Sequence, residues 1–77
     1  MIKAYVLIQV QVGRSSEVNG EIVRMESVTS SDVVSGPYDV IAVAEAADID
    51  DLAKLVVARI QAVDGVTRTL TCPVLSL

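Results

Sequence analysis

The stretch from Ser35 to Glu45, SGPYDVIAVAE, constrains the fold more than any other part of the chain. It begins with turn residues, because Gly36 can adopt a positive φ without steric cost and the proline that follows fixes its own φ. The next residues, 40–44, form an unbroken apolar run, which is typical of a strand covered on both faces. We therefore expect a central strand, with the polar pair Tyr38 and Asp39 at its start.

Alternation predicts the remaining strands. Residues 1–12 place apolar side chains at every even position, and Tyr5 and Leu7 make the opposite face half apolar. Residues 27–35 are more polar, so we expect an edge strand that pairs with the central strand as a hairpin. Residues 66–75 form the last strand, which we expect at an edge because it contains a proline. Its Cys72 is expected to be a small buried hydrophobe on the face toward the helices.

Two segments have the spacing of helices. In the first, Ser15 or Ser16 offers an N-cap, and apolar residues recur at Val18, Ile22 and Met25. In the second, Asp48 is the expected N-cap, acidic residues occupy the first turn, and Gly65 marks the end. The apolar stripe of this second helix is Ile49, Leu52, Ala53, Val56, Ile60 and Val63.

The order strand, helix, strand, strand, helix, strand predicts one domain over residues 1–77. Its class is α+β, a ferredoxin-like sandwich with both helices on one face of a four-stranded antiparallel sheet. The other face of the sheet is then uncovered. The chain is 52% hydrophobic with a mean hydropathy of +0.56, so it has more apolar side chains than a single thin core can bury. We therefore expect a homodimer formed through that face. The expected interface residues are Tyr5, Leu7, Ile41 and Val43.

Composition argues against several classes of function. Ten acidic against six basic residues give a net charge of −4, and aromatic residues are limited to two tyrosines, so we expect no direct nucleic-acid binding. Histidine is absent and there is one cysteine, which argues against Cys/His metal sites and His-activated nucleophiles. We expect no metal, no cofactor and no enzymatic activity. Without a signal segment or an apolar run long enough to cross a membrane, the expected location is cytoplasmic.

Three spaced motifs resemble the effector-binding domain, or RAM domain, of the Lrp/AsnC transcription regulators. They are Gly36-Pro37-Tyr38-Asp39, Gly65-Val66 and Thr69-Leu70-Thr71, and the resemblance spans nearly all 77 residues. Regulators of that family also carry an N-terminal helix-turn-helix domain, whereas Met1 here leads directly into a strand. We therefore expect an effector-binding module without that DNA-binding domain.

The resemblance implies a non-enzymatic amino-acid sensor. Its dimers would assemble further, into octamers or decamers, and it could also co-assemble with full-length regulators of the family. Effectors would bind at subunit contacts near the Gly-x-Tyr-Asp turn. The candidate ligand-binding residues are Gly36, Tyr38, Asp39, Thr69 and Thr71.

Each candidate also has a purely structural interpretation. Asp39 is as well explained by a turn aspartate that bonds backbone amides, Tyr38 by packing, and the threonines by a β-favouring edge strand. Two other classes share the element order: an ACT-like amino-acid-binding domain and a small dimeric ferredoxin-like monooxygenase. The monooxygenase would require a His or Trp in its pocket, and this chain has neither. The Gly13-Arg14-Ser15-Ser16 segment only weakly resembles the phosphate-binding loop of acylphosphatases.

Overall fold

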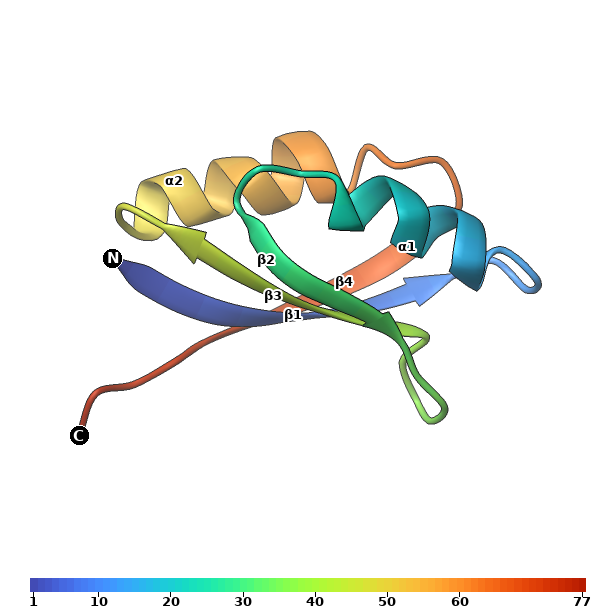
Figure 1. The fold of residues 1–77 in the computed structure, drawn as a ribbon, viewed down its shortest axis with the longest axis horizontal. Coiled ribbons are helices and arrows are strands. Elements are labelled where there is room, and N and C mark those ends of the chain that lie inside the picture. Colours follow the sequence, from blue (N-terminus) through green and yellow to red (C-terminus); the bar gives the residue numbers. More distant parts are fainter.

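The computed structural model describes residues 1–77 and confirms the predicted α+β, ferredoxin-like fold. In Figure 1 both helices lie on the same side of a curved sheet, and the C-terminal residues extend away from it. The elements are β1 (Ile2–Val10), α1 (Ser15–Val23), β2 (Val28–Val33), β3 (Val40–Ala46), α2 (Ile49–Lys54), the π-helical segment η1 (Leu55–Ile60) and β4 (Val66–Pro73).

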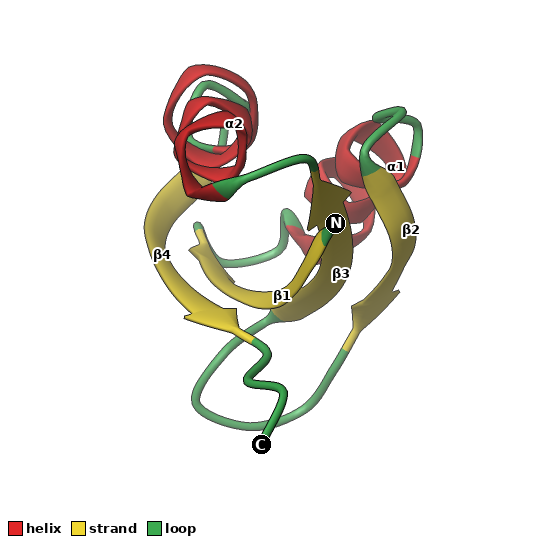
Figure 2. Ribbon diagram, turned by 90° about the vertical axis from the view of Figure 1, so that its left-hand side faces the viewer, coloured by secondary structure: helices red, strands yellow, loops and turns green.

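The sheet has the order β2-β3-β1-β4, and every neighbouring pair is antiparallel. The apolar run that begins at Val40 therefore lies inside the sheet, as predicted, and the more polar β2 lies at one edge. Figure 2 shows that the helices cover one face of this sheet and leave the other face bare. No helix is long and apolar enough to span a membrane.

The core lies between the sheet and the helices. Alternate residues of β1 and β3 point toward the helices and are buried, which is the expected consequence of the two-residue period of a strand. Val18 and Ile22 of α1 are fully buried against them, as their spacing predicted. The buried apolar set is Ala4, Val6, Ile8, Val18, Ile22, Val28, Val40, Ala42, Ala44, Ala46, Leu52, Leu55, Val56 and Ile60.

The prediction that Cys72 is buried toward the helices is wrong. Between the pairs Gln9–Arg68 and Val10–Val66, β1 advances by one residue and β4 by two, so the sheet contains a bulge at Thr67. A one-residue bulge reverses the alternation of every side chain beyond it. Cys72 is consequently exposed on the bare face, opposite Tyr5.

The start of α1 also differs from expectation. The first strand ends at Val10 rather than at Val12, whose side chain is fully exposed in the following turn. The N-cap is Arg14, without a side-chain capping bond, so neither serine fulfils the capping role. Asn19 and Gly20 lower the helix propensity of its interior, and a tertiary contact supports it: the buried Ser31 hydroxyl donates to Oδ1 of Asn19 at 2.6 Å.

The second helical segment begins as predicted and then widens. The Asp48 carboxylate accepts a hydrogen bond from the Asp51 amide at 2.8 Å, so it is the N-cap. Within η1 the turn becomes π-helical, with the Gln61 amide bonded to the carbonyl of Val56 at 2.8 Å. The buried stripe also differs from the expected one. Leu55 joins the core, whereas Ile49 and Ala53, predicted to be buried, are exposed.

Candidate functional site

The loop between β2 and β3 holds the Gly-x-Tyr-Asp motif at one end of the sheet. Gly36 has φ of +142°, a region that residues with a side chain rarely adopt. The Val34 amide donates to the Asp39 carbonyl at 2.9 Å and closes the loop. Gly36 and Pro37 are exposed at its tip, and Tyr38 is half-buried.

Asp39 fastens this loop to the central strand β1. Its carboxylate oxygen Oδ2 accepts a hydrogen bond from the Val10 amide at 2.9 Å, and its own amide donates to the Ile8 carbonyl at 2.9 Å. Gln9 adds a side-chain bond from Nε2 to the Pro37 carbonyl at 3.0 Å. The other carboxylate oxygen, Oδ1, has no hydrogen-bond partner within the chain. One oxygen of Asp39 is therefore structural and the other is available.

Thr69 and Thr71 lie elsewhere. Both are on the helix-facing side of β4, opposite Ile8 and Val6 of β1, because the bulge at Thr67 reverses the strand. Thr69 Oγ1 accepts a hydrogen bond from Nε2 of Gln61 at 2.8 Å. The two threonines line a cavity of about 370 Å³ between β4 and the second helical segment. Tyr38 and Asp39 do not line it, so one chain does not enclose all the predicted ligand-binding residues in a single pocket.

The bare sheet face carries the residues predicted for the dimer interface. Tyr5 of β1 is paired with Val43 of β3, and Leu7 is paired with Ile41, so these four side chains lie side by side on that face. On the other side, Leu7 is paired with Leu70 of β4, which is also exposed. Apolar side chains from three strands thus form one continuous patch in the isolated chain.

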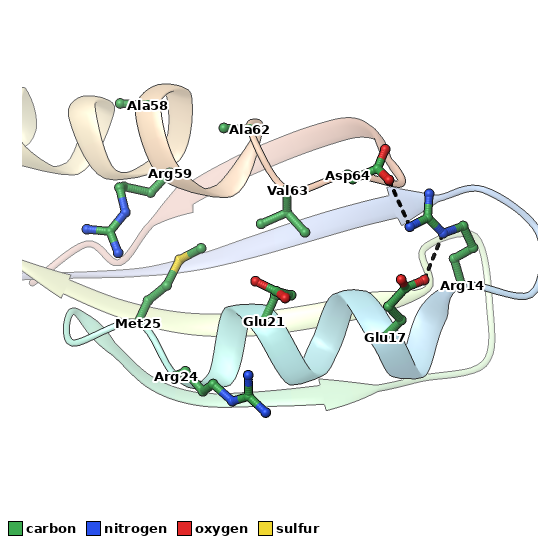
Figure 3. Close-up of a pocket in the computed structure, with 10 residues that line it drawn as sticks. All are labelled: Arg14, Glu17, Glu21, Arg24, Met25, Ala58, Arg59, Ala62, Val63 and Asp64. Atoms are coloured by element: carbon green, nitrogen blue, oxygen red, sulfur yellow. Dashed lines mark hydrogen bonds and ion pairs between the residues drawn. The ribbon is translucent and has the colours of Figure 1, made fainter.

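A cavity that the sequence did not indicate lies between α1 and η1. Its volume is about 530 Å³, and Figure 3 shows charged side chains reaching into it from both walls. Arg14 donates to Glu17 at 2.8 Å and to Asp64 at 3.1 Å. These bonds raise the pKa of Arg14 and lower the pKa of Glu17. Arg14 therefore joins the start of α1 to the turn after η1, and it does not present a free guanidinium in the manner of a phosphate-binding loop.

Gly65 explains how this ion-pair cluster forms. It is buried with φ of +102°, and a Cβ there would lie 3.1 Å from Cγ2 of Val18 and 3.2 Å from Cζ of Arg14. A side chain at this position would require Val18 and the guanidinium to shift by a few tenths of an ångström. The glycine that the sequence indicated as the end of the second helix therefore also makes room for Arg14 beside Asp64.

The sandwich of a four-stranded sheet and two helices, with one bare apolar face, defines a small α+β domain of the ferredoxin-like class. The sequence profile of the Lrp/AsnC ligand binding domain matches residues 3–77. This chain belongs to that family. The match favours the family resemblance over the ACT-like and monooxygenase alternatives.

Solved structures agree with this assignment. TTHA0845 from Thermus thermophilus is 31% identical with a TM-score of 0.94, and the alignment covers 100% of this chain and 96% of that one. AsnC from E. coli is 19% identical with a TM-score of 0.91, covering 99% of this chain and 52% of AsnC. The regulator NMB0573 from Neisseria meningitidis, solved in complex with L-Met, is 16% identical with a TM-score of 0.85, covering 97% and 50%. The chain thus spans about half the length of these two regulators. No curated protein sequence matches it significantly.

Proposed function

We propose that this chain is a non-enzymatic effector-binding and oligomerisation module that modulates transcription by sensing an amino acid. Membership of the Lrp/AsnC ligand-binding family supports the regulatory role. The structural likeness to a regulator solved with L-Met supports an amino acid as the class of effector.

The observation that supports a ligand site at Asp39 is that only one of its two carboxylate oxygens is bonded within the chain. Oδ2 is held by the Val10 amide, which fixes the orientation of the group, while Oδ1 remains free. A fixed carboxylate oxygen makes a short, strong bond to the ammonium group of an amino acid. Gly36, exposed at the loop tip, lets the effector approach the backbone closely, and Tyr38 provides an apolar wall.

Oligomerisation completes this site. The apolar patch on the bare sheet face pairs with its copy in a second chain and forms the dimer. Further assembly of dimers, into octamers or decamers, brings Thr69 and Thr71 of one subunit toward the loop of another, where their hydroxyl groups bond the effector carboxylate. The same surfaces permit co-assembly with full-length regulators of the family.

Thermal unfolding against a panel of the twenty amino acids tests this proposal. A ligand that binds only the folded state stabilises it by about 2.7 kcal/mol at one hundred times its dissociation constant. We expect a shift with one or a few amino acids, and loss of that shift in Asp39→Asn, which keeps an acceptor for the Val10 amide. The absence of a shift with all twenty amino acids would contradict the sensor role and leave only oligomerisation.

A further inference from the structure

The cavity between α1 and η1 is a groove with two differently charged ends. Both helical segments contribute walls, and the turn after η1 closes one end (Figure 3). The groove lies on the helix side of the molecule, away from the bare sheet face and the loop that contains Asp39. Its lining residues are Arg14, Glu17, Glu21, Arg24, Met25, Ala58, Arg59, Ala62, Val63 and Asp64.

One end of the groove is acidic. Arg14 binds two carboxylates at once, those of Glu17 and Asp64, so this cluster keeps a net negative charge. Glu21 lies one helical turn further along α1, and it forms no ion pair. In Figure 3 its carboxylate points across the groove toward the opposite wall. A cation at this end would meet an excess of carboxylate oxygens.

The other end is basic. Arg59 of η1 reaches toward Met25 in Figure 3, whereas the guanidinium group of Arg24, which also lines the cavity, points away from Arg59 along α1. Neither arginine forms an ion pair within the chain. The stretch between the two ends is apolar, and its side chains project little into the groove because Ala58 and Ala62 contribute only methyl groups. The groove therefore has an acidic end, an apolar middle and a basic end.

We propose that this groove binds a short peptide of two to three residues with free termini. The ammonium terminus of the peptide lies near the carboxylates of Glu21, Glu17 and Asp64. The carboxylate terminus of the peptide accepts hydrogen bonds from Arg59. Arginine is well suited to that role, because its planar guanidinium binds a carboxylate through two parallel hydrogen bonds. The side chains of the peptide rest on the alanine-lined middle.

The length of the groove sets the length of the ligand. The lining of the groove follows α1 from Glu17 to Arg24, which corresponds to about 10 Å at 1.5 Å per residue. An extended peptide spans about 3.3 to 3.6 Å per residue, so at most about three residues fit along the groove. A free α-amino acid carries both charges on one carbon and cannot reach both ends. The groove is thus distinct in specificity from the amino-acid site proposed at Asp39.

Nitrogen-15 NMR titration of the full chain tests this proposal, with Ala-Ala-Ala as the probe. We expect saturable shifts in the amides of residues 17–25 and 58–64. N-acetyl-Ala-Ala-Ala, which lacks the ammonium group, and Ala-Ala-Ala amide, which lacks the carboxylate, should each bind at least about tenfold more weakly, because each loses a hydrogen bond between charged groups.

Variants of the two unpaired groove charges assign the contacts. Glu21→Gln should weaken the free tripeptide about tenfold but leave the N-acetylated form unaffected, and Arg59→Gln should do the same with respect to the amidated form. Glu26→Gln and Arg68→Gln remove exposed charges outside the groove and are the matched controls.

Three results would overturn the proposal. The first is the absence of saturable shifts with Ala-Ala-Ala. The second is equal binding of the free and capped peptides, since the terminal charges would then play no part. The third is equal or tighter binding of free alanine in the groove, which would remove the length requirement.

Discussion

The Asp39 carboxylate accepts a hydrogen bond from the Val10 amide at 2.9 Å and thereby fastens the β2–β3 loop to the end of the central strand β1. The two residues are 29 positions apart in the chain. Asp39 therefore has a structural function whether or not it binds a ligand. A substitution at this position must separate the two roles.

Asp39→Ala and Asp39→Asn are predicted to differ in stability. Alanine leaves the part-buried Val10 amide without a partner, which costs about 1 to 3 kcal/mol of unfolding free energy. Asparagine keeps an oxygen acceptor and should cost less. Urea denaturation of both variants measures the difference, and equal stability of the two would mean that the hydrogen bond contributes nothing.

Leu7→Glu is predicted to leave a folded monomer. Leu7 lies in the middle of the bare sheet face, between Ile41 and Leu70, where a partner chain would bury an unpaired charge. Val12→Glu places the same charge on a fully exposed turn residue and is the control. Analytical ultracentrifugation at micromolar concentration should show an oligomer for the control and a monomer for Leu7→Glu. A dimer in both variants would place the interface elsewhere.

Ile22→Val should destabilise the chain by about 0.5 to 1.5 kcal/mol, because it removes one methylene group from a fully buried side chain. Its neighbour Val23 is 48% exposed, so Val23→Ala should change stability by less than about 0.5 kcal/mol. Chemical denaturation compares the two. Similar losses at both positions would show that α1 is not packed through the face that contains Ile22.

Asp48→Ala should cost about 0.5 to 2 kcal/mol, because the Asp51 amide loses its cap acceptor. Asp48→Ser retains an oxygen acceptor at this position, so thermal unfolding should place it close to the unsubstituted chain. If serine is as destabilising as alanine, the charge of Asp48 near the start of α2 matters more than the hydrogen bond.

The ion pair of Glu17 with Arg14 should contribute to stability only while Glu17 is charged. Its pKa is lowered in the folded chain, first by the hydrogen bond from Arg14. The contribution is thus fully present above the pKa of an unfolded glutamate, about 4.3, and is lost as the pH falls through the lower folded value. In NMR titrations, Arg14→Gln should raise the pKa of Glu17, and an unchanged pKa would contradict the pairing.

Much of the fold follows from local pattern. The order of the elements, the inner position of the strand at Val40, the polar edge strand β2 and the Asp48 cap were all predicted correctly. Strand alternation and capping depend on residues close together in the chain, so a sequence displays them directly. The helix face that contains Ile22 was identified for the same reason.

The errors concern features that the local pattern of apolar and polar residues does not encode. The bulge at Thr67, which moved Cys72 to the bare face, arises from the pairing of β4 with β1. In the second helical segment Ile49 is exposed and Leu55 is buried, and residues 55–60 are π-helical rather than α-helical. Neither feature has a local composition that distinguishes it from a regular strand or helix.

The same division applies to the sites. The sequence alone identified the Gly36 turn, the apolar face around Leu7 and the polar pair at Asp39, because turn chemistry and two-residue alternation are local properties. Only the tertiary structure separated Thr69 from Asp39, and only it joined Arg14 to Asp64, 50 residues away, at one end of the groove. Strand register and helix docking decide which distant side chains meet, and these depend on the packing of the whole core rather than on any single stretch of the chain.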